Sequence, residues 1–274
     1  MRIDSHQHFW YYNPVRESWI TDDMAQIRRD FMPEDLQPLL EQNKMDGCVL
    51  VQADDSEEES QFLLELSANH AYIKGVVGWV DLTDEGCEKR LAHFSRQEKF
   101  KGIRHTLQAE TPEFILREDF QRGISKLADF DLTYDLLLLE KHLPAAVELV
   151  KNFPDQRFVL DHMAKPQISN GISRGWLKGI QELAKAGNVY CKISGFFVET
   201  NNFQWQVTDF DPFFKVVLDL FGEDKLMFGS DWPVCLAAGT YADTVGITED
   251  FFSELSENVC DKVMGINAAN FYSL

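Results

Sequence analysis

The sequence predicts one α/β domain, a (β/α)8 barrel of the TIM type, over residues 1–274. The length of 274 residues suits a single barrel of this kind. Hydrophobic residues make up 45% of the chain and aromatic residues 12%, which is enough for a large core and argues against disorder. Short apolar runs alternate from end to end with longer amphipathic stretches, as repeated βαβ units require.

Eight short apolar runs are the expected strands. They lie at Arg2–Ser5, Cys48–Val51, Ile73–Val80, Gly102–His105, Leu132–Leu137, Phe158–Asp161, Val189–Ile193 and Leu226–Gly229. Right-handed βαβ units built on these runs give a parallel sheet, and eight such units can close into a barrel. A doubly wound open sheet is the alternative. Its nucleotide-binding version is disfavoured because no Gly-rich phosphate-binding loop follows any run.

Eight amphipathic stretches are the expected helices. They cover Pro33–Met45, Glu57–Asn69, Asp84–Gln97, Arg117–Asp129, His142–Lys151, Trp176–Ala186, Pro212–Phe221 and Thr248–Met264. Pro33 suits the first turn of its helix, and the stretch from Glu57 opens with acidic residues, which the helix dipole favours. No low-complexity linker or change in composition interrupts the alternation, so we expect one domain.

The charge balance and the cysteines limit the partners and the location. The chain has 45 acidic and 26 basic side chains, a net charge of −19, whereas nucleic acids and anionic membranes bind basic surfaces. No apolar run approaches the roughly 20 residues of a membrane helix, and the first residues lack the apolar segment of a secretory signal. The five cysteines form no CxxC pair and leave one unpaired in any disulfide scheme. Cys48 and Cys191 lie inside apolar runs, which favours buried thiols in a reducing compartment. We therefore expect a cytoplasmic protein with no nucleic-acid or membrane partner.

Polar residues at the ends of three expected strands form the candidate reaction centre, because catalytic groups of a barrel lie at the carboxyl ends of its strands. His6 and His8 follow the first strand two residues apart, so both imidazoles can face the same side. His162 follows the sixth strand and Asp231 the eighth. Imidazole and carboxylate are donors that tetrahedral zinc prefers, and Asp231 can also act as a general base. A structural pair of histidines is the alternative for His6 and His8 taken alone.

Five motifs, in this order along the chain, carry a resemblance to a known family. They are Asp4-Ser5-His6-Gln7-His8-Phe9-Trp10, Gly102-Ile103-Arg104-His105, Leu160-Asp161-His162-Met163-Ala164-Lys165-Pro166, Cys191-Lys192-Ile193-Ser194-Gly195 and Gly229-Ser230-Asp231-Trp232-Pro233-Val234-Cys235. The chain resembles the amidohydrolase-related branch of the amidohydrolase superfamily. Within it, the chain is most similar to the sugar lactonases that hydrolyse L-fuconolactone or L-rhamnonolactone. The resemblance implies a distorted (β/α)8 barrel whose metal ligands and catalytic residues are His6, His8, His162 and Asp231.

Two departures from the binuclear members of this superfamily bear on the metal. The fourth strand ends at Arg104 and His105, without the lysine or glutamate that bridges two metals. The fifth strand ends at Tyr134-Asp135-Leu136, without a histidine ligand. The resemblance therefore implies one divalent metal, zinc, and the alternative is catalysis without a metal, as in some lactonases of the branch.

Further residues near the strand ends are candidates for substrate binding. They are Arg104, His105, Lys165, Lys192, Trp10, Glu199 and Trp232. The four basic residues could stabilise the oxyanion that forms from a lactone carbonyl. Arg104 and His105 are adjacent, so only one of them faces inward, and Lys192 is expected to point toward the barrel mouth. The tryptophans could pack on an apolar sugar face, with ordinary rim packing as the alternative, and Glu199 could reach the substrate from the loop after the seventh strand.

The expected function is hydrolysis of a sugar-acid lactone to the aldonate. Asp231 would take a proton from the attacking water and later return one to the ring oxygen. A small sugar lactone is the expected partner, and a homo-oligomer is left open. The alternatives are a metal-dependent decarboxylase or amide hydrolase with the same site, and a barrel that binds sugar acids without turnover.

Overall fold

The computed structural model describes all 274 residues and contains one eight-stranded parallel sheet. The strands are β1 (Ile3–Gln7), β2 (Gly47–Val51), β3 (Ile73–Gly78), β4 (Phe100–His105), β5 (Thr133–Leu136), β6 (Phe158–Leu160), β7 (Val189–Ile193) and β8 (Leu226–Phe228). Each strand pairs with the next in sequence order, from β1 to β8. Register shifts between β1 and β2, β2 and β3, and β3 and β4 distort the first half of the sheet.

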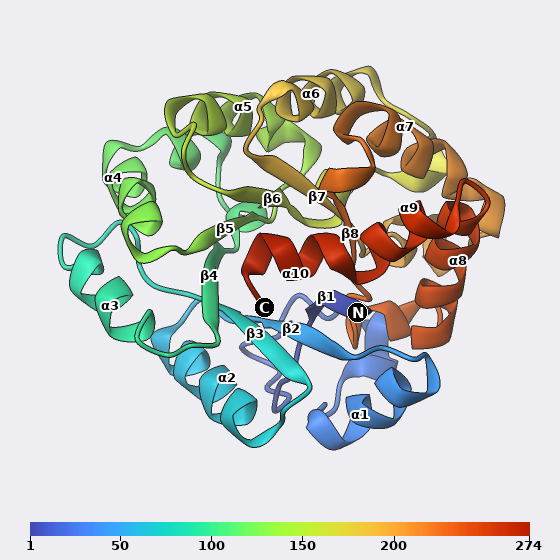
Figure 1. The fold of residues 1–274 in the computed structure, drawn as a ribbon, viewed down its shortest axis with the longest axis horizontal. Helices are drawn as coiled ribbons and strands as arrows, with labels where there is room; N and C mark the ends of the chain where they lie inside the picture. Colours follow the sequence, from blue (N-terminus) through green and yellow to red (C-terminus); the bar gives the residue numbers. More distant parts are fainter.

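Hydrogen bonds between β1 and the segment after β8 close the sheet. The Asp231 N–H donates to the His6 carbonyl at 2.8 Å, and the His8 N–H donates to the Trp232 carbonyl at 2.7 Å. The sheet is therefore the predicted barrel (Figure 1). The doubly wound alternative is excluded, because strand order would reverse within such a sheet.

A ring of helices surrounds the barrel (Figure 1). They are α1 (Pro33–Gln42), α2 (Glu57–Asn69), α3 (Cys87–Phe94), α4 (Glu118–Leu127), α5 (Leu143–Asn152), α6 (Arg174–Lys185), α7 (Asp211–Phe221) and α8 (Tyr241–Ser253). The first seven overlap the predicted helices. None of the helices is long and apolar enough to cross a membrane.

Several predicted boundaries were wrong, and two of them bear on the fold and the site. The last predicted helix, Thr248–Met264, is interrupted after α8 because the Ser256 hydroxyl accepts the Val259 N–H and begins a new helix, α9 (Glu257–Asp261). A π-helical turn over Lys262–Ile266 and α10 (Asn267–Tyr272) follow. The first predicted strand also ended too early, because β1 continues to Gln7 and so includes His6.

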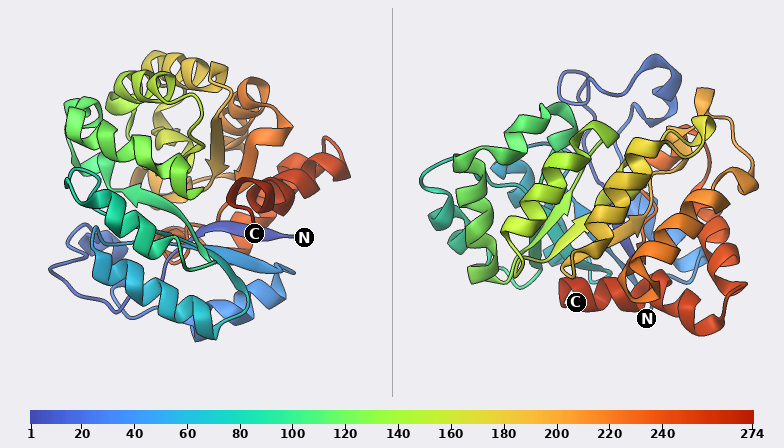
Figure 2. Two further views of the ribbon diagram at one scale, coloured as in Figure 1. Left: turned by 60° about the vertical axis from the view of Figure 1, so that its left-hand side comes forward. Right: turned by 90° about the horizontal axis from the view of Figure 1, so that it is seen from above.

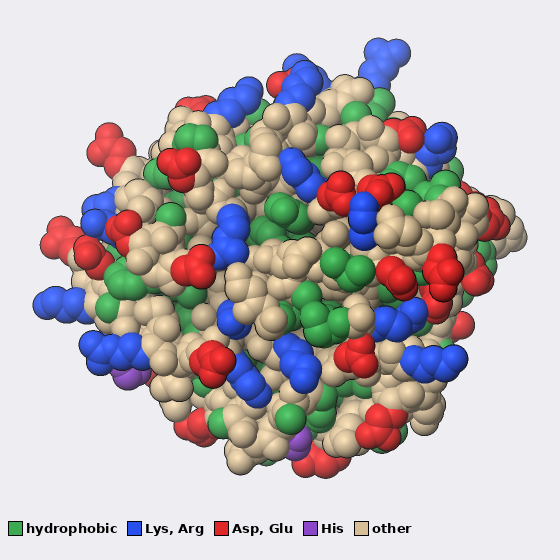
Figure 3. Space-filling model, viewed as in Figure 1, with side chains coloured by type: hydrophobic (Ala, Val, Ile, Leu, Met, Phe, Trp, Pro, Cys, Tyr) green, Lys and Arg blue, Asp and Glu red, His purple; other side chains and the backbone are tan.

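The two ends of the barrel are covered differently. Helix α10 lies across the end where the strands begin (Figures 1 and 2), and its Phe271 and Tyr272 pack on the apolar side chains of Val49, Val159 and Met227. Acidic and basic side chains are interspersed over this face of the molecule (Figure 3). At the opposite end, where the strands finish, the long loop between β1 and α1 rises above the barrel (right panel of Figure 2). The candidate site lies at that second end.

Candidate active site

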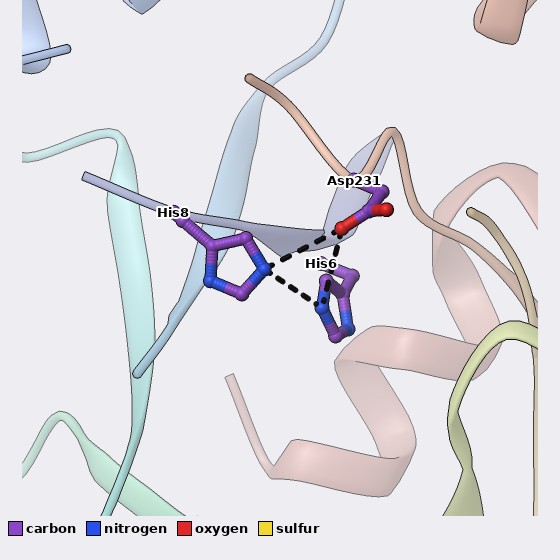
Figure 4. Close-up of side chains that lie close together, drawn as sticks. All are labelled: His6, His8 and Asp231. Carbon is purple, nitrogen blue, oxygen red and sulfur yellow. Dashed lines mark hydrogen bonds and ion pairs between the residues drawn. The ribbon is translucent and has the colours of Figure 1, made fainter. Parts of the chain in front are cut away.

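His6 and His8 present their Nε2 atoms to each other at the end of β1, 3.2 Å apart (Figure 4). The Val51 carbonyl lies 2.8 Å from His8 Nδ1. Since a carbonyl can only accept, His8 carries its proton on Nδ1 and leaves Nε2 free. Asp231 Oδ1 lies 3.4 Å from His8 Nε2 and 3.8 Å from His6 Nε2. The two imidazoles and the carboxylate therefore converge on one point.

His162 joins this group from a left-handed turn after β6. Four consecutive residues, His162 to Lys165, have positive φ angles between 50° and 60°. This conformation costs roughly 1–2 kcal/mol for each L-residue, so the surrounding structure must hold it. The Ser194 hydroxyl lies 2.8 Å from His162 Nδ1, and a Cβ at Gly195 would lie only 2.6 Å from the same nitrogen. The turn directs His162 Nε2 to within 3.9 Å of Asp231 Oδ1.

Asp4, which the sequence analysis missed as a site residue, shapes the turn that carries Asp231. Its carboxylate accepts the Ser230 N–H at 2.9 Å, the Ser230 hydroxyl at 2.6 Å and the Tyr241 hydroxyl at 3.1 Å. Burial raises the pKa of Asp4 to about 6, although these hydrogen bonds oppose the rise. The sequence signal was its place in the motif Asp4-Ser5-His6-Gln7-His8, two residues before His6.

The ionisation states suit a cation bound between these residues. Burial lowers the pKa of His6 and His8, and it lowers the pKa of His162 to about 4, so all three imidazoles are neutral near pH 7. Burial opposes ionisation of Asp231, but the neighbouring histidines outweigh this effect and hold the pKa of its carboxyl below the usual range. Neutral imidazoles beside a carboxylate are the ligand forms that divalent metals require.

The donor atoms fit one divalent metal. Ligand atoms of His6, His8 and Asp231 lie within 4.8 Å of one another, and His162 Nε2 faces the same carboxylate oxygen. Partners of the opposite ring nitrogens fix the orientation of His8 and His162, as in known metal sites. A second possible group, His6, Asp161 and His162, shares two of these residues. Its aspartate is already paired with Arg104 at 3.2 Å and Lys192 at 2.9 Å.

A buried charged layer lies beneath His6 inside the barrel. Lys192 Nζ lies 2.6 Å from Asp135 Oδ2, 2.9 Å from Asp161 Oδ1 and 3.1 Å from His6 Nδ1. The Tyr272 hydroxyl of α10 donates to Asp135 at 2.7 Å. Lys192 has no exposed surface, so it does not reach the barrel mouth, and the predicted contact with substrate is corrected on this point. Asp135 and Asp161 pull its ammonium group inward, and their effect was not visible from β7 alone.

A cavity of about 250 Å³ opens above the candidate metal ligands. Its polar lining consists of His8, Arg104, Thr106, Gln108, His162, Lys165 and Asp231. Its apolar lining consists of Trp10, Trp19, Ala53, Ala109, Leu137 and Val234. A mostly preformed pocket with convergent polar groups is typical of a small-molecule site.

The remaining candidates for substrate binding divide into two groups. Trp10, Arg104 and Lys165 line the cavity. Glu199 belongs to the second group, which does not line the cavity. Its carboxyl group lies 3.7 Å from the Lys165 ammonium group, and burial raises its pKa.

Two more candidates, His105 and Trp232, lie away from the cavity. His105 faces outward from β4 and stacks on Phe114 at 5.0 Å between ring centroids, because successive strand residues alternate sides and Arg104 takes the inner one. Trp232 is buried between Phe9 and Phe31. Neither lines the cavity, so the structure does not support the predicted substrate contacts at these positions.

A family model for amidohydrolases matches residues 3–274 of the chain. The chain belongs to the amidohydrolase family. Two curated relatives named L-fucono-1,5-lactonase, from Burkholderia ambifaria and Burkholderia multivorans, are 34% and 36% identical to this amidohydrolase over its whole length and 96% of theirs. A crystal structure of a Burkholderia multivorans amidohydrolase with bound zinc has a TM-score of 0.96 and 36% identity, covering 100% of this chain and 99% of that one. This amidohydrolase is therefore an enzyme of the hydrolytic type that the sequence motifs predicted.

Proposed function

We propose that this amidohydrolase hydrolyses a sugar-acid lactone, of the L-fucono-1,5-lactone or L-rhamnonolactone type, to the aldonate. The observation that carries the proposal is the convergence of the Asp231 carboxyl group with three imidazoles at the base of a cavity whose wall includes two basic side chains. The two relatives named L-fucono-1,5-lactonase, which match over the whole chain, support this substrate class.

The residues of the site divide the chemistry between them. Asp231 would accept the proton of the attacking water and then deliver a proton to the ring oxygen as it leaves. Arg104 and Lys165 line the same cavity and would donate hydrogen bonds to the carbonyl oxygen as negative charge develops on it. Trp10 would pack against the apolar face of the sugar. A divalent metal held by His6, His8, His162 and Asp231, which we propose to be zinc, would add Lewis-acid chemistry.

The test is proton release from L-fucono-1,5-lactone and related aldonolactones, followed with a pH indicator and corrected for spontaneous opening. The enzyme is assayed as purified and after chelation, and its metal content is measured each time. Asp231→Asn should abolish hydrolysis and leave the circular dichroism spectrum unchanged. Asp219→Asn, a similar change at an exposed ion pair of α7, should retain wild-type turnover.

Other outcomes would separate the alternatives. Wild-type turnover in Asp231→Asn would refute the role of this carboxylate. Release of carbon dioxide or ammonia in place of aldonate would favour a decarboxylase or an amide hydrolase. Binding of sugar acids without turnover would favour a binding protein. We also propose that residues 1–274 form one domain. We propose a cytoplasmic location as well, which five free, buried cysteines support.

A further inference from the structure

Two of the hydrogen bonds that hold Arg104 go to a single residue, Gln52, which follows β2. The Arg104 Nε–H donates to the Gln52 side-chain oxygen at 2.8 Å, and Nη2 donates to the Gln52 backbone carbonyl. A guanidinium group bound along one edge by two acceptors has a fixed plane. The opposite nitrogen, Nη1, then faces Asp161 Oδ2 and His6 Nε2, each at 3.2 Å.

Gln52 is itself fixed by its remaining groups. Its side-chain amide donates to Asp55 Oδ1 at 2.6 Å, and its backbone N–H donates to the Val77 carbonyl at 2.9 Å. Asp55 in turn accepts the Thr106 hydroxyl at 2.9 Å and the Thr106 N–H at 3.1 Å. The loop after β2 is thus tied to the end of β4 across the intervening strand β3. This arrangement allows only one orientation of the Gln52 amide.

Gln52 is fully buried and is not among the residues that line the cavity. It therefore has no direct contact with a bound molecule. Arg104, by contrast, lines the cavity. Three of its five N–H groups have acceptors in Gln52 and Asp161, a fourth faces His6 Nε2, and one on Nη2 is left. The remaining donor capacity is available beside the metal-site residues, where the carbonyl of a lactone would lie.

We infer that Gln52 is a positioning residue for the hydrolysis, which acts by holding the Arg104 guanidinium in the orientation that stabilises the developing oxyanion. The inference rests on the proposed function, because it takes the role of Arg104 from it. Such a group accelerates the reaction only if it is oriented before the charge develops. Loss of the Gln52 side chain should therefore lower kcat more than it raises KM.

The first experiment compares two glutamine-to-leucine variants of the full chain. Gln52→Leu should lower kcat roughly ten- to a hundredfold, the effect of losing one hydrogen bond to a charged donor, with KM changed less than about threefold. Gln156→Leu is the matched control, because Gln156 is also buried and donates to two backbone carbonyls at 2.9 Å. Gln156 precedes β6, at the opposite end of the barrel, and its variant should keep the wild-type kcat.

The second experiment distinguishes positioning from a structural effect. In Arg104→Ala, millimolar guanidinium chloride should restore part of the activity, because Gln52 still provides two acceptors for the free cation. In the double variant Gln52→Leu/Arg104→Ala, half-maximal rescue should need at least a fivefold higher guanidinium concentration. Rescue that is absent from the single variant, or equal in both, would overturn the inference. So would a kcat of Gln52→Leu within twofold of wild type, or an equal fall in Gln156→Leu. An inactive wild type would instead refute the proposed function itself.

Discussion

Removal of the buried ammonium group by Lys192→Met should destabilise the protein strongly. Lys192 Nζ lies 2.6 Å from one carboxylate and 2.9 Å from a second, and all three side chains have no exposed surface. The variant leaves Asp135 with only the Tyr272 hydroxyl, so its charge is no longer balanced. Breaking a buried ion pair in this way costs about 3–5 kcal/mol. An unfolding entropy of about 2.1 cal/mol/K per residue over 274 residues converts this to a fall in Tm of roughly 5–9 °C.

The stability lost in Lys192→Met should also depend on pH. Burial raises the pKa of Asp135 to about 6 in the wild type, although Lys192 opposes the rise. Without Lys192 this pKa rises further, whereas an aspartate in the unfolded chain keeps a pKa of about 3.9. The folded variant then binds more protons than the unfolded chain, so its stability falls as the pH rises from about 4 through 6 and above. The deficit relative to wild type should be larger at pH 8 than at pH 5.5.

The assay is urea and thermal unfolding, followed by circular dichroism at both pH values. Lys215→Met removes the same group from an exposed pair with Asp219 and should change stability by less than about 0.5 kcal/mol. The double variant Lys192→Met/Asp135→Asn should recover part of the loss, because the unpaired charge is gone. A Lys192→Met deficit below about 1 kcal/mol, or one that is equal at both pH values, would refute the reasoning.

Two further predictions concern stability alone. Burial raises the pKa of Glu59 to about 7, so the wild type should lose stability as the pH rises from 5 to 8, and Glu59→Gln should reduce this loss by up to about 3 kcal/mol in urea unfolding. An equal fall in the free energy of unfolding between pH 5 and 8 in wild type and Glu59→Gln would contradict this prediction. In α4, a Cβ at Gly123 would overlap the Leu82 carbonyl oxygen, so Gly123→Ala should cost about 1–3 kcal/mol despite the better helix propensity of alanine. The control is Gly246→Ala in α8, where a Cβ meets no atom within 4 Å, so this variant should stabilise the protein by up to about 1 kcal/mol. If Gly246→Ala lost as much stability as Gly123→Ala, steric overlap would not be the cause of the loss at Gly123.

The barrel and the convergence of the four candidate metal ligands were predictable from the sequence because both depend on local signals. Alternating apolar runs and amphipathic stretches indicate βαβ units, and the ends of parallel strands meet at one edge. His6, His8, His162 and Asp231 could therefore be expected to lie together before any coordinates were known, and the structure brings them together. The predictions at the C-terminus and at the end of β1 failed in their boundaries. At the C-terminus, a single capping residue, Ser256, starts a new helix.

The directions of the charged side chains were decided by tertiary structure. Arg104 faces inward and His105 outward because the register of β4 in the closed barrel sets which side of each residue is interior. Lys192 turns down beneath His6 because Asp135 and Asp161, 57 and 31 residues away in the chain, place two carboxylates there. Local periodicity determined that eight strands would form and which chemical groups would end them. The register of the strands decided which of those groups face the cavity, and attraction between strands distant in sequence decided that Lys192 is buried below it. Both act only once the barrel has closed.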